Sequence, residues 1–258
     1  MRPPNLPVTA AAPRSGPASV SRTADADGTA YDIGVRLLRR HGEAGRREFA
    51  MLGRRWDLLP EVFAPIHTDS TELFTRWLPL PVGGTFLEMG CGAGVTAVTA
   101  ALEGCAQVTA ADISPDAVRN TELNAARHGV ADRVHALRSD LFDALAPEAR
   151  FDVIFWNSNV VHAPADFAYT CGLQHAIFDR EYAAHRRYLR DGQARLTASG
   201  RLFLGFNSLG DAERLDAVAA DAGARITEYA ALDRRAGDVP VTFRLLEITR
   251  GDAPGAAA

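Results

Sequence analysis

The chain has 258 residues, of which 47% are apolar and 23% are charged, a length and balance typical of one sizeable globular domain. The formal net charge of −4 gives no overall basic field of the kind that drives nucleic-acid binding. All 28 basic residues are arginines, which leaves no lysine for a catalytic role. Three cysteines without paired spacing predict neither a disulfide framework nor a metal site. These cysteines, and the lack of an apolar run of ~18 residues, predict a cytoplasmic protein.

Composition divides the chain into four parts. Residues 1–28 are rich in Pro, Ala, Ser and Gly and lack apolar periodicity, so they predict a disordered tail, and residues 251–258 predict a second one. Residues 29–80 predict a small helical cap, and residues 81–250 predict an α/β domain.

The cap is predicted to be helical over about residues 31–59. Its apolar residues recur at the spacing of one helix face, and they are Ile33, Leu37, Leu38, Phe49, Leu52 and Trp56. Two prolines then mark a loop, after which Thr68 or Ser70 can cap a short helix from about Thr71 to Trp77.

From Thr85 onward, apolar strands alternate with helical stretches, which is the pattern of a doubly wound α/β fold. Strands are predicted at 85–89, 107–111, 133–137, 152–156, 201–206, 225–229 and 241–248, and helices at 95–103, 115–128, 180–196 and 211–222. No clear helix separates the last two strands, so we expect an antiparallel hairpin through Asp233–Asp238. The predicted fold is a Rossmann-like seven-stranded sheet, mostly parallel with an antiparallel last strand, and with a small N-terminal helical cap.

A glycine-rich loop follows the first strand of this domain and opens its first helix. The loop is Glu88-Met89-Gly90-Cys91-Gly92-Ala93-Gly94, and its glycines allow a tight turn and a close approach to a ligand. The pattern is G-x-G-x-G, whereas NAD-binding folds carry G-x-G-x-x-G, and Glu88 would be poorly placed beside a pyrophosphate. A carboxylate there suits the positively charged aminoacyl end of S-adenosylmethionine. Cys91 is expected to pack in the loop and not to act as a nucleophile.

Three further strands end in polar residues, which are Asp112, Asp140 and Asn157. Open α/β sheets bind ligands at the carboxyl ends of their strands, and a carboxylate at Asp112 can accept hydrogen bonds from ribose hydroxyls. Together with the glycine loop, these ends favour S-adenosylmethionine over NAD(P), over another nucleotide and over a purely structural turn.

These segments resemble the class I S-adenosylmethionine-dependent methyltransferases, and within them the branch that contains the release-factor glutamine-N5 methyltransferases. The resemblance covers about residues 60–248 and is carried by Phe86–Gly94, Val108–Ser114, Ser139–Phe142 and Phe151–Asn157, with added support from Thr71–Leu73 and Ala117–Asn124. It implies that S-adenosylmethionine is the cofactor.

The resemblance also implies a role for each cofactor-binding residue. Glu88 and the loop glycines Gly90 and Gly92 would hold the methionine portion of the cofactor. Asp112 would bind the ribose, and Ile113 would lie against the adenine. The remaining contacts would come from Asp140 and Leu141 at the adenine edge, Thr68 and Thr71 in the preceding loop, and Asn157 beside the methyl group.

The chain departs from this branch directly after the fourth strand. The branch carries Asn-Pro-Pro-Tyr, whose Asn and backbone bind a planar nitrogen and whose aromatic ring stacks on it, whereas this chain has Asn157-Ser158-Asn159-Val160. The loss of both prolines and of the ring favours a small polar substrate over a protein glutamine or a nucleobase. Asn157 and Asn159 are candidates to position that substrate, and a capping role for Asn159 is the alternative.

A polar segment, residues 161–175, follows this motif and is predicted to be a long loop that covers the substrate. His162, Tyr169 and His175 are its candidates for a base or an orienting group, and Tyr169 is a candidate catalytic residue. A packing or surface role is the alternative for each.

The sequence leaves several functions open. The first hypothesis is N- or O-methylation of a small polar metabolite, with no nucleic acid, membrane or metal involved and with a homodimer left open. A second is consumption of S-adenosylmethionine without methyl transfer, by cyclisation or transfer of its aminobutyryl chain and release of methylthioadenosine. Methylation of a protein glutamine, and an inactive cofactor-binding partner subunit, are further alternatives.

Overall fold

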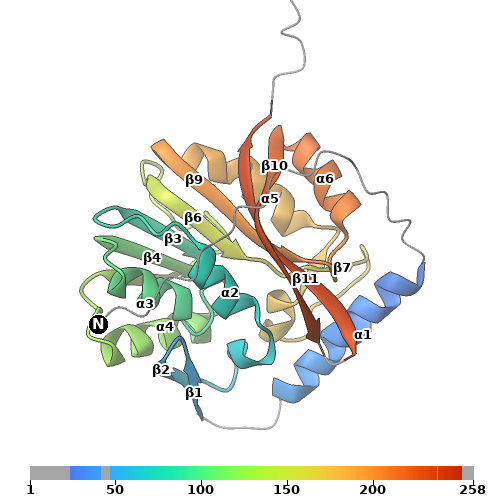
Figure 1. Cartoon of the computed structure of the whole chain (residues 1–258), viewed down its shortest axis with the longest axis horizontal. Coiled ribbons are helices and arrows are strands. Elements are labelled where there is room, and N and C mark those ends of the chain that lie inside the picture. Colours follow the sequence, from blue (N-terminus) through green and yellow to red (C-terminus); the bar gives the residue numbers. More distant parts are fainter. Residues whose placement is uncertain (1–23, 42–46, 237, 252–258) are drawn as a thin grey trace, which may run out of the picture.

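The computed structural model describes residues 24–41, 47–236 and 238–251, so both predicted tails lie mostly outside the described residues. Its centre is a seven-stranded sheet in the order β10-β11-β9-β6-β3-β4-β5 (Figure 1). The strands of this sheet are β3 (Thr85–Met89), β4 (Gln107–Asp112), β5 (Val134–Arg138), β6 (Phe151–Asn157), β9 (Leu196–Asn207), β10 (Ala224–Ala236) and β11 (Val239–Arg250).

The sheet is mostly parallel, which confirms the predicted fold class. Strands β5, β4, β3, β6 and β9 pair in parallel, whereas β11 is antiparallel to both of its neighbours, β9 and β10. The last two strands form the expected hairpin, in which Ala236 pairs with Val239 across the turn.

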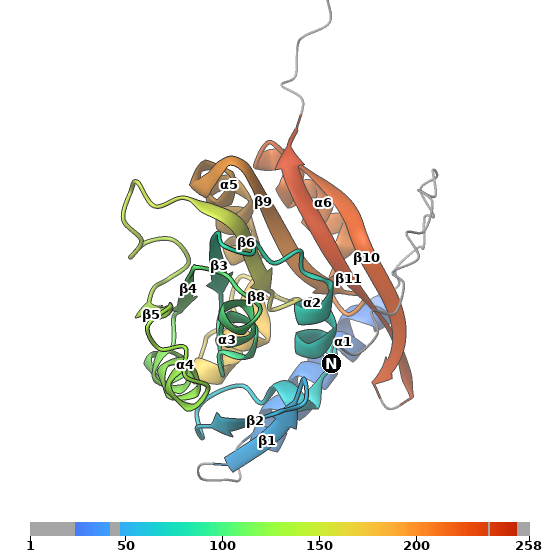
Figure 2. The same ribbon diagram turned by 60° about the vertical axis from the view of Figure 1, so that its left-hand side comes forward.

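Helices cover both faces of the sheet (Figures 1 and 2). Helices α2 (Ser70–Trp77), α3 (Val95–Leu102) and α4 (Pro115–Arg127) pack on one face, and α5 (Ala183–Gly192) and α6 (Ala212–Asp221) pack on the other. Because side chains alternate along a strand, neighbours divide between the two cores. Phe86 and Phe155 lie under α2–α4, while Leu87 and Trp156 face α5 and α6.

The segment before the sheet is only partly helical, so the prediction of one helical cap is wrong for its second half. Helix α1 (Ala24–His41) contains residues 24–28, which had been assigned to the tail, but residues 47–58 form the hairpin of β1 (Arg47–Met51) and β2 (Arg54–Leu58). The two-residue turn is Leu52-Gly53, with φ of 52° and 70°, as the favoured hairpin turns require. Phe49 and Trp56 are direct cross-strand partners, so their seven-residue spacing satisfies a hairpin as well as a helix.

The region after β6 is more regular than the long loop predicted for it. Val161–Ala163 forms β7, which pairs in parallel with β8 (Phe178–Arg180), and a 3₁₀ turn spans Gly172–Ala176. The predicted helix from Arg180 to Leu196 is shorter, because α5 covers only Ala183–Gly192. None of the helices in the described part of the chain is long and apolar enough to cross a bilayer.

Trp56 anchors the hairpin and yields a first prediction. Its side chain is fully buried, and its indole N–H donates to the Met51 carbonyl at 2.9 Å. We expect Trp56→Ala to lower the free energy of unfolding by about 3–5 kcal/mol, the usual cost of removing a buried aromatic side chain. Urea denaturation would measure this loss. Arg55→Ala is the control on the same strand, because the Arg55 side chain is 78% exposed. An equal loss in both variants would contradict the anchoring role.

Candidate cofactor and active site

One pocket gathers almost all of the residues that the sequence singled out. Because parallel strands point their carboxyl ends to the same edge of the sheet, the residues that follow β3, β4, β5 and β6 meet there. The predicted residues that line the pocket are Thr68, Thr71, Glu88, Gly90, Gly92, Asp112, Ile113, Asp140, Leu141, Asn157 and Asn159. Tyr169 is not among the lining residues.

The glycine loop bends sharply at the rim of the pocket. Gly90, Gly92 and Gly94 have φ of 64°, 53° and 77°, a region in which other residues are strained. The Gly92 N–H donates to the Asp112 carboxylate at 2.9 Å. A Cβ at Gly94 would lie within 2.9 Å of the Thr121 backbone, so this position also allows α4 to approach the loop closely.

Glu88 is a buried carboxyl group in the wall of the pocket. It is 4% exposed and accepts a hydrogen bond from the Ala97 N–H at 2.7 Å. Burial raises the pKa of Glu88 to about 8, although hydrogen bonds from Thr96 and Ala97 act in the opposite direction. Glu88 is therefore largely protonated at neutral pH in the free protein. Burial also raises the pKa of the Cys91 thiol well above its ordinary value, as expected for a packing residue.

Asp112 ends β4 and holds two backbone groups. One oxygen accepts from the Gly92 N–H and the other from the Ser114 N–H, both at 2.9 Å. Burial raises the pKa of Asp112 and outweighs these bonds. A carboxylate has about four acceptor positions, so Asp112 can accept further hydrogen bonds from a ligand.

The residues after β5 also line the pocket. Leu141 is buried and has a positive φ of 51°. The Asp140 carboxylate accepts a hydrogen bond from Arg187 at 2.8 Å. Arg187 was not among the candidate site residues predicted from the sequence. The Asp140 side chain is thus already paired, and a ligand would meet the Asp140–Leu141 segment beside this ion pair.

Asn157 ends β6, and its amide is held in one orientation by α2. Its NH₂ group lies 3.2 Å from the Ser70 hydroxyl and 3.4 Å from the Thr71 hydroxyl, and Ser70 is in turn 2.8 Å from the Thr68 hydroxyl. An NH₂ group engaged in this way leaves the side-chain carbonyl oxygen for another donor. Ser70 had been considered only as a helix cap, so sequence analysis missed its contact with Asn157.

Asn159 is 7% exposed, and its NH₂ group is fully used. It donates to the His175 carbonyl at 3.0 Å and to the Phe178 carbonyl at 2.9 Å. The structure therefore gives Asn159 a bridging role between the end of β6 and the segment before β8. Asn159 also lines the pocket, and its side-chain oxygen is buried without a hydrogen-bond partner among the described residues, so its expected role in positioning a substrate stays a prediction.

His175 lies in the pocket wall, on the 3₁₀ turn Gly172–Ala176. Its ring stacks on Tyr169 with 3.9 Å between ring centroids and 10° between planes. The Tyr169 hydroxyl donates to the Phe178 carbonyl and accepts from the Arg180 N–H, each at 3.2 Å, so Tyr169 supports His175 from outside the pocket. Burial lowers the pKa of His175, which favours a neutral imidazole. His162 lies elsewhere, 3.4 Å from Glu181.

Helix α1 and the loop after β2 complete the pocket. Ile33, Gly34 and Leu37 line it from α1, and Phe63 lines it from the loop. A Cβ at Gly34 would lie 2.8 Å from the Phe178 ring, so this glycine lets α1 lie close to β8. The apolar stripe of α1 was visible in the sequence, but no local signal showed what it would cover.

The chain is similar to methyltransferases in both sequence and fold. The model of a family described as "Methyltransferase domain" matches residues 86–175. The release factor glutamine methyltransferase of Bordetella pertussis is 39% identical over 119 residues, which cover 44% of this chain and 42% of that protein. The ribosomal protein L11 methyltransferase of Pelotomaculum thermopropionicum is 41% identical over 75 residues, 29% of this chain and 24% of that protein. The chain thus spans less than half the length of these relatives.

The fold is shared with a solved T. thermophilus 16S rRNA methyltransferase in complex with AdoMet and guanosine. The TM-score is 0.58 at 20% identity, and the match covers 81% of this chain and 52% of that one. The names of these relatives state protein and RNA substrates. They overturn our expectation of a small-molecule substrate with no nucleic acid, which had rested on the missing prolines and on net charge. The matched methyltransferase segment includes the strand ends around the pocket, and in this segment the chain is similar to the S-adenosylmethionine-dependent methyltransferases.

Proposed function

We propose that this protein transfers the methyl group of S-adenosylmethionine to a nitrogen atom of a protein side chain. The observation that carries the proposal is the fixed orientation of Asn157, whose NH₂ group is directed to Ser70 and Thr71. Its carbonyl oxygen is then available to accept a hydrogen bond from an N–H group. A protein acceptor is favoured over RNA because the two relatives described above, at 39% and 41% identity, are named for protein substrates, whereas the RNA enzyme shares only the fold.

The residues around the pocket fit S-adenosylmethionine. The open, positive-φ backbone at Gly90 and Gly92 allows close approach, and a Cβ at Gly92 would meet nothing within 4 Å. Glu88 would hold the ammonium group of the methionine portion, and Asp112 would bind the ribose. Ile113, 38% exposed, and Leu141 would contact the adenine beside Asp140. Thr68 and Thr71 would close the site through the contacts that they make with Ser70 and Asn157.

When bound, the cofactor supplies an activated methyl group. The acceptor nitrogen forms a bond to the methyl carbon while the carbon–sulfur bond breaks, and the sulfur keeps the electron pair. The protein must align these atoms and accept the proton that the nitrogen loses. We assign this proton to His175, the imidazole in the pocket wall. Tyr169 and Asn159 hold the segment that carries His175, so we assign them positioning roles.

A direct test is incubation of the purified protein with radiolabelled S-adenosylmethionine and one of three acceptors: bacterial release factor, ribosomal protein L11, or 16S rRNA. Label in a protein, located by peptide mass spectrometry on a side-chain nitrogen, is the expected result. Label only in RNA would overturn the choice of acceptor. Methylthioadenosine released without any acceptor would instead support consumption of the aminobutyryl chain.

Asn157→Ala is expected to lower kcat by about 10²-fold or more, because alignment of the reacting atoms depends on this side chain. Affinity for S-adenosylhomocysteine should change little, since the glycine loop stays intact. Ser70→Ala should have an intermediate effect, because it removes one of the two hydroxyls that orient Asn157. Steady-state kinetics and calorimetry would measure both quantities. Unchanged kcat in Asn157→Ala would rule out the proposed role.

His175→Gln is expected to lower kcat by about 10²- to 10⁴-fold, the usual contribution of a general base. The pKa of His175 lies below the ordinary value of histidine. Because the neutral imidazole is the active form, the wild-type rate should fall as the pH drops below this pKa and should stay level at higher pH. Burial sets this direction, and the carboxylates of Asp140 and Asp179 oppose it. A variant that keeps the wild-type pH profile would show that another group accepts the proton.

Binding of S-adenosylhomocysteine should release a proton from Glu88. The pKa of Glu88 is about 8 in the free protein, and a ligand ammonium group beside it stabilises the carboxylate. At pH 6.5 we expect release of about one proton per ligand, and affinity that rises with pH until the free carboxyl group is ionised. Calorimetry in buffers of different ionisation enthalpy measures the released protons. Glu88→Gln should bind more weakly and release none, and proton release that persists in this variant would exclude Glu88 as the source.

A further inference from the structure

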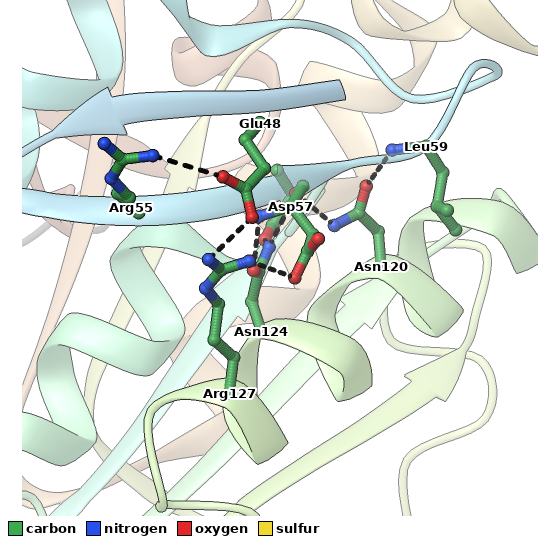
Figure 3. Close-up of polar contacts among 8 residues, drawn as sticks. Glu48, Arg55, Asp57, Leu59, Asn120, Asn124 and Arg127 are labelled. Atoms are coloured by element: carbon green, nitrogen blue, oxygen red, sulfur yellow. Dashed lines mark hydrogen bonds and ion pairs between the residues drawn. The ribbon is translucent and has the colours of Figure 1, made fainter. Parts of the chain in front are cut away.

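Two fully buried asparagines on α4 connect the N-terminal hairpin with the α/β domain (Figure 3). Asn120 accepts from the Leu59 N–H at 2.7 Å and donates to the Asp57 carbonyl at 2.8 Å. Asn124 accepts from the Asp57 N–H at 2.8 Å and donates to the Asp57 carbonyl at 2.9 Å. Side chains one helical turn apart thus bind the backbone at the end of β2 and just after it.

Asn124 makes one contact that Asn120 does not make. Its NH₂ group also donates to the carbonyl of Ala93, in the middle of the glycine loop, at 2.8 Å. Because the Asp57 N–H must meet the amide oxygen, the NH₂ group of Asn124 has to face Ala93 and the Asp57 carbonyl. The hairpin therefore fixes the orientation of the amide that holds the loop.

The direction of the loop carbonyls decides what the loop offers to a ligand. Thr121, on the same helix, donates to the Gly92 carbonyl at 3.3 Å, next to the bond from Asn124 to Ala93. In a trans peptide the N–H points opposite to the carbonyl, so turning the Gly92 carbonyl toward α4 turns the Ala93 N–H away from α4. Thr121 and Asn124 therefore fix the orientation of these two peptide groups from the α4 side of the loop.

We propose that Asn124 is a positioning residue of the cofactor loop and that it couples the hairpin to cofactor binding. The proposal rests on the proposed function, because it takes S-adenosylmethionine as the ligand of the glycine loop. The same backbone that Asn120 and Asn124 hold continues through the loop to Ser70 and Thr71, the partners of Asn157. A shift of the hairpin would therefore act on the glycine loop, on the cofactor side of the pocket, and on Asn157, on the acceptor side.

The outer contacts of the hairpin bind the same helix but not the loop. Arg127 donates to Asp57 at 2.8 Å and to Glu48 at 2.7 Å, and Arg55 lies 3.5 Å from Glu48 (Figure 3). These groups dock the hairpin on α4 without reaching Ala93. Among the described contacts, Asn124 is the side chain that touches both the hairpin and the glycine loop.

The chain offers a matched pair of variants for the test. Asn124→Ala and Asn120→Ala remove the same side chain from the same buried helix face, and both loosen the hairpin, but only the first releases Ala93. We expect the Kd for S-adenosylhomocysteine to rise at least tenfold in Asn124→Ala, within the usual range of coupling between sites. In Asn120→Ala it should stay within about threefold of the wild type, because Asn124 still binds both the Asp57 N–H and the Ala93 carbonyl in that variant. Calorimetry measures the Kd, and thermal denaturation shows whether the two variants lose similar stability.

Hydrogen exchange of the wild-type protein gives a second readout that does not depend on any variant folding. Coupling is reciprocal, so S-adenosylhomocysteine should slow amide exchange in the peptide that contains the Asp57 N–H, which lies outside the pocket. Equal losses of affinity in the two alanine variants, or no protection of that peptide in the wild type, would overturn the coupling while leaving the proposed function intact. Failure of the wild type to bind S-adenosylhomocysteine at all would overturn both.

Discussion

The hydrogen bond between the Gly92 N–H and the Asp112 carboxylate is the contact on which the rest of the site depends. It joins the loop after β3 to the end of β4, the two neighbouring strands that begin the pocket. Three glycines with positive φ let the loop turn within a few residues, and inside it the Gly94 N–H donates to the Cys91 carbonyl at 2.7 Å. The other backbone groups of the loop lie outside regular secondary structure. These groups must therefore be satisfied by neighbouring elements, and Asp112 and α4 supply their partners from two sides.

Burial of carboxyl groups at this edge of the sheet costs solvation free energy, and a bound ligand can offset part of that cost. Glu88 and Asp112 each have a raised pKa because burial disfavours the charged form. Their hydrogen bonds from Ala97, Gly92 and Ser114 offset only part of that cost. A cationic ligand group beside Glu88 would offset more of it, which is why such carboxyl groups are common in binding sites. Burial of these carboxyl groups lowers the stability of the free protein, and it favours the binding of a ligand that carries a positive charge.

Part of the site is determined by local sequence patterns and could be predicted from them. Strand ends are visible in one sequence, since buried parallel strands are continuous apolar runs and the polar residues that follow them must lie at the same edge. The α4 start could also be predicted, because Pro115 stands at a favoured first position, and the structure shows that the Ser114 side chain caps the helix there. The cofactor side of the pocket, from Glu88 to Asn157, follows from these two rules.

The other part depends on contacts between distant segments. Phe49 and Trp56 fit a helix or a hairpin equally well, and the turn at Leu52-Gly53 decides between them. Asn120 and Asn124 lie in a helix that was predicted correctly, yet their partners Asp57 and Leu59 are more than sixty residues away along the chain. For His175, the stacking on Tyr169 depends on the pairing of β7 with β8, which no local pattern indicated.

The altered residues after β6 show how rigidity can be kept by different means. Two prolines would fix the backbone through their rings, whereas Ser158 and Asn159 fix it through hydrogen bonds. Ser158 donates to the Gly205 carbonyl at 2.8 Å, on the neighbouring strand, and Asn159 donates to the carbonyls of His175 and Phe178. These bonds tie the end of β6 to the segment that carries His175. On the proposed function, the segment that carries His175 would therefore shape the acceptor side of the pocket together with Asn157.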